Sequence, residues 1–148
     1  MPDALTSHVS IIPATPASWP WILHSFRHQI GGIDGGPSLL AESQRRALER
    51  ILRGGIGPAV VAVPVGFPTE FLGWAVAVDG RVLYAYVRSV FRRQGVGAQL
   101  VCAVTDRVPV EVAYWTPEAQ AIADHGWPIR YEIQAYRTLL AFTHERTA

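Results

Sequence analysis

A loop with two glycines and two adjacent arginines carries the strongest chemical signal in the sequence. It reads RRQGVG over residues 92–97, between a predicted strand at residues 82–87 and a predicted helix at residues 95–106. The first N–H groups of a helix have no partner within it, and the helix dipole adds partial positive charge there. Gly95 and Gly97 would let the backbone approach a phosphate closely. The loop therefore predicts an anion site, with a pyrophosphate as its natural ligand.

Two well-known phosphate motifs do not fit this loop. The dinucleotide fingerprint needs a third glycine and a later acidic residue on a strand, and both are absent. The Walker pattern needs a lysine, and the chain contains none. The anion site must therefore belong to another kind of phosphate-binding protein.

Periodicity and turn residues predict the elements that position the loop. Strands are expected at residues 9–12, 59–65, 71–78, 82–87 and 108–114, and strand-like stretches at residues 129–134 and 137–143 close the chain. Helices are expected from Thr15, as N-cap, to Gly31-Gly32, from Ser38 to Arg53, from Gly95 to Asp106, and from Thr116 to Gly126. This order predicts a mixed sheet with helices on both faces.

The composition is that of a small globular chain. Its 148 residues are 49% apolar and 17% charged, so we expect a single domain over residues 1–148. The net charge of +1 argues against a nucleic acid partner. No apolar run reaches the roughly 20 residues of a membrane span, and the first ten residues lack signal-peptide features. We therefore expect no membrane partner and a cytoplasmic location.

The cysteine and histidine residues indicate neither a disulfide nor a metal site. Cys102 is the only cysteine, and its apolar surroundings in the sequence predict a buried structural thiol. His24 and His28 are four residues apart on the first predicted helix, but no third ligand accompanies them. No metal is predicted.

The segment at residues 86–100 resembles the acetyl-coenzyme A loop of the GNAT superfamily of N-acetyltransferases. That pattern is Arg or Gln, two residues, Gly, one residue, then Gly or Ala, and Arg92, Gly95 and Gly97 match it. Ser89 departs from the proline that often precedes the loop. The resemblance covers essentially the whole chain. It implies a GNAT-like α/β fold, with a mixed, mostly antiparallel sheet of six or seven strands and helices on both faces.

The resemblance also implies a co-substrate, acetyl-coenzyme A, and an acceptor amine on a small molecule or a protein. The pantetheine arm would lie along the strand that ends at Val87, and a backbone N–H near Val87 would stabilise the thioester carbonyl. The amine would attack the thioester directly. The residues implied in co-substrate binding are Tyr86, Val87, Arg92, Arg93, Gln94, Gly95, Val96, Gly97 and Ala98.

The resemblance is incomplete at the catalytic positions. The strand at residues 82–87 has no carboxylate, so Glu111 is the nearest candidate base, with a structural ion pair or solvent exposure as its alternative role. Ala123 stands where the superfamily often has the tyrosine that protonates the leaving thiolate. Other tyrosines and a histidine are therefore candidates for the general acid that protonates the thiolate. The candidates are Tyr131, Tyr136 and His125, while Tyr84 and Tyr86 either line the acceptor site or pack in the core.

Three functions are therefore considered. The first is an N-acetyltransferase dependent on acetyl-coenzyme A. The second is a coenzyme A-binding sensor or partner module without turnover, motivated by the missing catalytic groups. The third is a GNAT-fold enzyme that modifies nucleic acid, against which the near-neutral charge argues. A homodimer is also expected from the resemblance.

Overall fold

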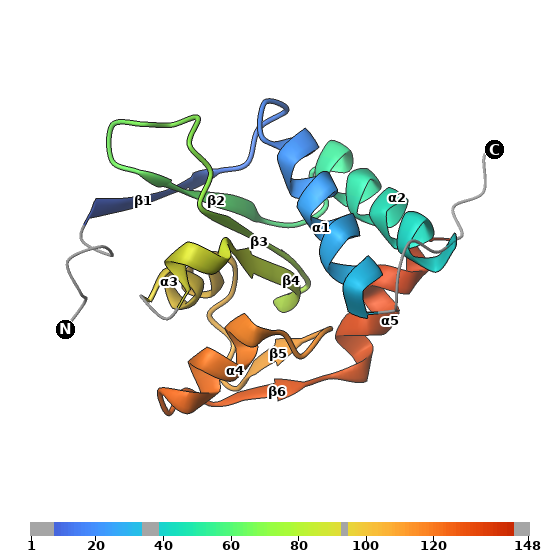
Figure 1. The fold of residues 1–148 in the computed structure, drawn as a ribbon. Coiled ribbons are helices and arrows are strands. Elements are labelled where there is room, and N and C mark those ends of the chain that lie inside the picture. Colours follow the sequence, from blue (N-terminus) through green and yellow to red (C-terminus); the bar gives the residue numbers. More distant parts are fainter. Residues whose placement is uncertain (1–7, 34–38, 93–94, 144–148) are drawn as a thin grey trace.

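The fold is built on one six-stranded sheet with the strand order β1-β2-β3-β4-β5-β6 (Figure 1). The computed structural model describes residues 8–33, 39–92 and 95–143. The strands are β1 (Val9–Pro13), β2 (Ala59–Pro64), β3 (Gly73–Val78), β4 (Arg81–Val87), β5 (Val110–Val112) and β6 (Ile129–Tyr131). The helices are α1 (Trp19–Ile33), α2 (Leu39–Gly54), α3 (Val96–Val104), α4 (Pro117–Asp124) and α5 (Ile133–Ala141), with a 3-10 turn η2 (Ser89–Phe91).

Strand directions divide the sheet into two parts. β1 to β4 are antiparallel to their neighbours, whereas β4, β5 and β6 run parallel. The predicted mixed, mostly antiparallel sheet of six or seven strands is thus confirmed with six. The predicted meander at residues 59–87 is confirmed as β2, β3 and β4, the last two joined by the tight turn at Asp79-Gly80.

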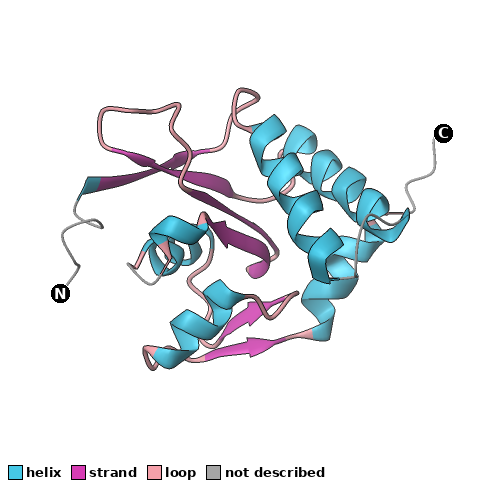
Figure 2. Ribbon diagram, in the orientation of Figure 1, coloured by secondary structure: helices cyan, strands magenta, loops and turns pink. Residues whose placement is uncertain are grey.

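Helices cover both faces of the sheet, as predicted (Figure 2). On one face, α1, α2 and α5 pack over Trp74 and Tyr84. On the other face, α3 and α4 pack over small and branched residues of β3, β4 and β5. The alternation of side chains along each strand sends successive residues into these two apolar layers.

Two predicted helix or strand assignments are wrong. The stretch predicted as a strand at residues 137–143 belongs to α5, because Ala135 and Leu139 recur at the spacing of one helix face and are both buried. The first helix begins at Trp19 rather than at Thr15. Ser18 Oγ bonds to both the N–H and the carbonyl of Thr15, at 3.0 Å each, which closes a turn ahead of the helix.

Other differences are smaller. α1 continues through Gly31-Gly32 to Ile33, since glycine weakens a helix without necessarily ending it. Ser38, the predicted cap of α2, lies outside the described residues. Cys102 is exposed on α3 rather than buried, because the buried stripe of that helix is formed by Leu100, Val101 and Val104.

The parallel strands β4 and β5 separate soon after they meet. Their only register pair in the described sheet is Val82 with Val112, followed by the bond from Ala113 N–H to the Val82 carbonyl at 3.0 Å. β4 then continues to Val87 without β5 beside it, and Glu118 in the first turn of α4 accepts a hydrogen bond from Val87 N–H there. This divergence opens the sheet at the end of β4, next to the predicted anion loop.

No helix in the described part of the chain has the length and apolar character needed to cross a bilayer.

Candidate functional site

A cleft of about 430 Å³ lies between α3 and α4, at the end of β4. Its walls come from three places: the end of β4, the first turn of α3, and one face of α4. The lining residues are Val87, Arg92, Gly95, Gly97, Ala98, Pro117, Glu118, Gln120, Ala121, Ile122, Asp124, His125 and Trp127. Its volume is in the usual range for a small-molecule site.

The structure brings most of the predicted loop residues to this cleft. Val87, Arg92, Gly95, Gly97 and Ala98 line it. The remaining predicted residues are placed differently. Val96, the first residue of α3, has a buried side chain. Tyr86 is half-buried against Trp21 on the opposite face of the sheet. Arg93 and Gln94 lie outside the described residues.

The backbone at the start of α3 has the geometry that the loop predicted. Gly95 is the N-cap residue with φ of 86°, a left-handed conformation that a side chain would strain. The first bond of the helix runs from Gln99 N–H to the Gly95 carbonyl at 3.2 Å. Helix geometry therefore leaves the N–H groups of residues 96–98 without an acceptor inside α3. These donors and the positive end of the helix dipole lie beside the cleft, which suits a phosphate.

Gly97 of α3 faces the end of β4 and the first turn of α4. A Cβ added at Gly97 would lie 3.7 Å from both Glu118 Cβ and Val87 Cγ2. The position thus tolerates a methyl group sterically, but that group would project between the helices that form the cleft. The glycine leaves this space open for a ligand.

Arg92 and Glu118 together close the end of β4. Glu118 Oε1 accepts hydrogen bonds from Val87 N–H at 3.2 Å and from Arg92 Nε–H at 3.0 Å. The same Arg92 Nε–H also donates to the Val87 carbonyl oxygen at 3.0 Å. Both main-chain groups of Val87 are therefore paired, although β5 does not extend to this end of β4.

Glu118 is a site residue that the sequence analysis did not identify. Thr116 is the N-cap of α4, and its side chain accepts from Ala119 N–H at 3.1 Å; Pro117 follows as the first helical residue. This start directs Glu118 into the opening between β4 and β5, where only 5% of the residue is exposed. An acid in the first turn is common at exposed helix starts, so the sequence offered no signal that this carboxylate is buried.

Glu111, the predicted base, lies elsewhere. It is buried on β5 and forms ion pairs with Arg107 at 2.5 Å, Arg130 at 2.8 Å and Arg81 at 3.5 Å. Hydrogen bonds from Arg130 and then Arg107 lower the pKa of Glu111 to about 2. This arrangement favours the structural ion pair, the alternative role considered for Glu111.

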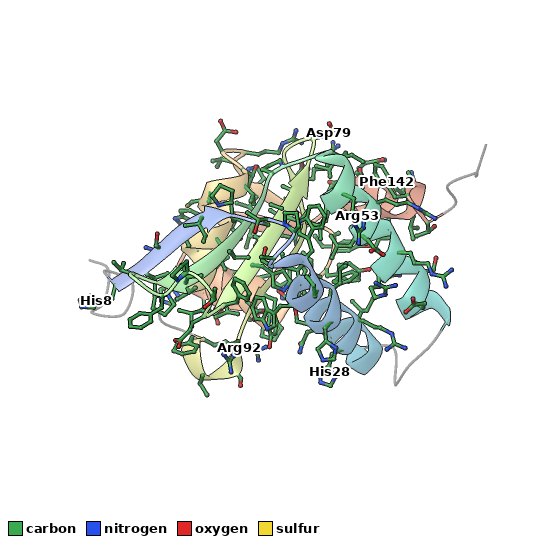
Figure 3. The ribbon with its side chains drawn as sticks, turned by 90° about the horizontal axis from the view of Figure 1, so that it is seen from above. His8, His28, Arg53, Asp79, Arg92 and Phe142 are labelled. Carbon is green, nitrogen blue, oxygen red and sulfur yellow. The ribbon has the colours of Figure 1, made fainter. Side chains whose placement is uncertain are left out.

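Glu111 and the cleft also lie toward opposite ends of β4. Arg107, which holds Glu111, donates to the Asp79 carbonyl at 3.0 Å. Figure 3 shows Asp79 and Arg92 on opposite sides of the molecule. The structure therefore does not bring Glu111 together with the loop residues.

The tyrosines fall into two groups. Tyr84 and Tyr86 share one face of β4, as predicted, and Tyr84 packs against Phe26, Trp74 and Tyr114. Burial, followed by the charge of Glu118, raises the pKa of Tyr84. Tyr131 is half-exposed on the edge strand β6, away from the residues that line the cleft.

The remaining candidates have simpler surroundings. Tyr136 accepts a hydrogen bond from Gln44 Nε2 at 3.2 Å, and Gln44 Oε1 accepts from Tyr114 at 2.5 Å, so this tyrosine joins α5 to α2. His125 ends α4 and its Nδ1 lies 2.8 Å from the Ala121 carbonyl, as expected for a helix C-terminus. Ala123 leaves α4 without a hydroxyl group at this position.

The residues described by the structure contain no group of three or more His, Cys, Asp or Glu side chains that could hold a metal ion. His24 and His28 are both exposed, and Figure 3 shows His28 on the outer side of α1.

Comparison with known proteins supports the fold but gives no relative by sequence. No protein-family model and no curated protein matches the chain. Among solved structures, the fold is similar to that of a possible acetyltransferase from Clostridium difficile 630, with a TM-score of 0.50 and 13% identity, covering 95% of this chain and 92% of that one. A transcriptional regulator from Bacillus halodurans C-125 has a TM-score of 0.47 and 18% identity, covering 95% of this chain and 97% of that one. At these identities the likeness concerns the fold alone.

Proposed function

We propose that this protein is a cytoplasmic N-acetyltransferase of the GNAT type that transfers an acetyl group from acetyl-coenzyme A to an amine. The observation that carries the proposal is the cleft at the end of β4, which is bounded by the glycine-rich start of α3. Its glycines, its N-terminal N–H groups and its position beside diverging parallel strands together suit a long ligand with a pyrophosphate at one end. The likeness to a possible acetyltransferase supports the same fold class.

The chain's own groups have distinct tasks in this proposal. The N–H groups of residues 96–98 bind the pyrophosphate, and Gly97 keeps the path between α3 and α4 open. The main-chain groups at the end of β4, around Val87, bind the pantetheine arm and polarise the thioester carbonyl. Bound acetyl-coenzyme A supplies the activated acetyl group. The opening between β4 and β5 lets an amine on a small molecule or a protein approach.

Two glycines with the same backbone conformation provide a matched test. Gly95 at the cleft and Gly66 after β2 both have φ of 86° and both are exposed. Replacing either with alanine imposes the same kind of backbone strain, about 1–2 kcal/mol. We expect Gly95→Ala to weaken acetyl-coenzyme A binding at least tenfold and Gly66→Ala to leave it unchanged, as measured by titration calorimetry.

The outcome of this test is decisive for the co-substrate. Absence of acetyl-coenzyme A binding by the wild-type protein would refute the proposal. Equal affinities for both alanine variants would place the binding site elsewhere.

A second function, a coenzyme A-binding module without turnover, is favoured by two observations. The Arg92–Glu118 pair already satisfies both main-chain groups of Val87, and Ala123 supplies no acid for the leaving thiolate. Thiol release in the presence of a broad panel of amines separates the two functions. A module would bind the co-substrate and release no thiol above the background rate.

A further inference from the structure

Glu118 is the buried carboxylate closest to the proposed reaction centre in the described structure. Its side chain is 4% exposed, and its Oε1 lies 3.2 Å from the Val87 nitrogen. Asp124 also lines the cleft, but it is exposed and bonded to Gln120 Nε2 at 2.7 Å. Glu111 is held by arginines toward the other end of β4.

The position of Glu118 overlaps the position that the proposed co-substrate requires. A carbonyl oxygen that bound Val87 N–H would compete with Glu118 Oε1, which already accepts from that N–H at 3.2 Å. The displaced carboxylate would still be tied to the first turn of α4, which Thr116 and Pro117 anchor. It would therefore remain beside the end of β4, where the carbonyl binds.

Arg92 contacts both groups involved when a ligand displaces the Glu118 carboxylate from Val87 N–H. Its Nε–H is shared between Glu118 Oε1 and the Val87 carbonyl, and its guanidinium lies 5.9 Å from the centre of the Tyr86 ring. When the main-chain groups of Val87 bind a ligand, the guanidinium can keep its bond to the displaced carboxylate.

We propose that Glu118 is the general base of the reaction and accepts the proton of the attacking amine. This role rests on the proposed transferase function. The neutral amine attacks the thioester carbon, a C–N bond forms, and the C–S bond breaks with its electron pair remaining on sulfur. The amine proton passes to Glu118, which then returns it through solvent to the thiolate. The products are the amide and the coenzyme A thiol.

The experiment compares two substitutions of Glu118 in the full-length protein. Glu118→Gln retains an acceptor for Val87 N–H and removes the base, whereas Glu118→Asp retains a carboxylate in a shorter side chain. Glu49→Gln, at a half-buried position of α2 outside the cleft, is the control for the same chemical change. Thiol release from acetyl-coenzyme A is measured with the best amine of a panel between pH 5 and 9, together with acetyl-coenzyme A affinity by calorimetry.

A base at position 118 predicts a specific pattern. Glu118→Gln should lower kcat about 100-fold or more across this pH range, because general-base catalysis contributes roughly 10²–10⁴-fold. Its acetyl-coenzyme A affinity should stay within a few-fold of wild type. Glu118→Asp should have a kcat between those of Glu118→Gln and the wild type, because it keeps a carboxylate on a shorter side chain, and Glu49→Gln should match the wild type.

Other outcomes separate the two proposals. If the wild type turns over and Glu118→Gln keeps its kcat and its pH profile, the role of Glu118 is overturned and the transferase function stands. If the wild type binds no acetyl-coenzyme A, or releases no thiol from any amine, both are overturned. If Glu118→Gln does not fold, as judged by circular dichroism, an unchanged kcat in the folded Glu118→Asp variant overturns the role, because the shorter side chain moves the carboxylate away from the amine.

Discussion

At the scale of single residues, two buried glutamates have different surroundings and hence different tasks. Glu111 is held by three guanidinium groups, which stabilise its ionised form and leave it little capacity to accept a proton. Glu118 has one arginine and one backbone N–H as partners, and it faces a cleft. The first pattern is that of a structural ion-pair cluster, and the second is that of a group available for chemistry.

The effect of pH on stability tests the structural role of Glu111. Its pKa is about 2 in the folded protein against 4.5 for the free side chain, so the unfolded chain binds this proton more readily. The stabilisation by Glu111 is therefore complete above pH 4.5 and is lost as the pH falls from 4.5 toward 2. Urea unfolding should show Glu111→Gln to be less stable than wild type at pH 7, with the gap narrowing toward pH 3.

The exposed Glu70→Gln variant is the control for that measurement, and its urea midpoint should follow that of the wild type. A gap between Glu111→Gln and wild type that stays constant from pH 7 to pH 3 would contradict the ion-pair role.

The glycines that line the cleft could be singled out from sequence, whereas the buried position of Glu118 could not. A local pattern specifies Gly95 and Gly97, because the conformation of a strand-to-helix loop depends on the residues within it. The burial of Glu118 depends instead on where α4 packs against diverging strands that are distant in sequence. Charge at a helix start alone does not distinguish an exposed acid from a buried one.

At the scale of elements, the start of α4 determines where Glu118 points. Thr116 bonds to Ala119 N–H, and Pro117 supplies the fixed backbone angle of the first helical residue. The same signal was clear in the sequence, and the start of this helix was predicted correctly. The helix at residues 133–141 was not, because its short apolar stretch suits a strand as well as a helix and only packing distinguishes them.

Removal of the α4 cap should therefore affect both stability and binding. Thr116→Ala should reduce the free energy of unfolding by about 1 kcal/mol, the usual cost of losing an N-cap side chain. It should also weaken acetyl-coenzyme A binding, since α4 forms one wall of the cleft. Denaturant unfolding measures the change in stability, and titration calorimetry measures the change in binding.

Thr138→Ala is the control for Thr116→Ala. Thr138 lies within α5, where its hydroxyl bonds to the Gln134 carbonyl at 2.8 Å and caps nothing. Thr138→Ala should leave stability within about 0.5 kcal/mol and binding unchanged, because alanine is at least as favourable as threonine inside a helix. Equal effects of the two substitutions would argue against a special role for the α4 start.

At the scale of the whole molecule, the two faces of the sheet have different tasks. The α1, α2 and α5 face contains the large aromatic residues and the Gln44–Tyr114–Tyr136 network, which join the helices to the sheet. The α3 and α4 face uses smaller side chains and contains the cleft. A ligand in the cleft would thus contact elements that are separate in sequence, β4, α3 and α4, and join them.

This division predicts that acetyl-coenzyme A stabilises the protein through one face. A ligand at 100 times its Kd raises the free energy of unfolding by about 2.7 kcal/mol if it binds only the folded chain. We expect this increase for wild type and Gly66→Ala, and a much smaller one for Gly95→Ala at the same concentration. Hydrogen exchange should locate the added protection at the N–H groups of residues 96–98, which have no acceptor within α3 and would bind the pyrophosphate. β1 and β2 should gain local protection only to the extent that global unfolding is suppressed, so selective protection there instead would mean that the ligand binds another surface.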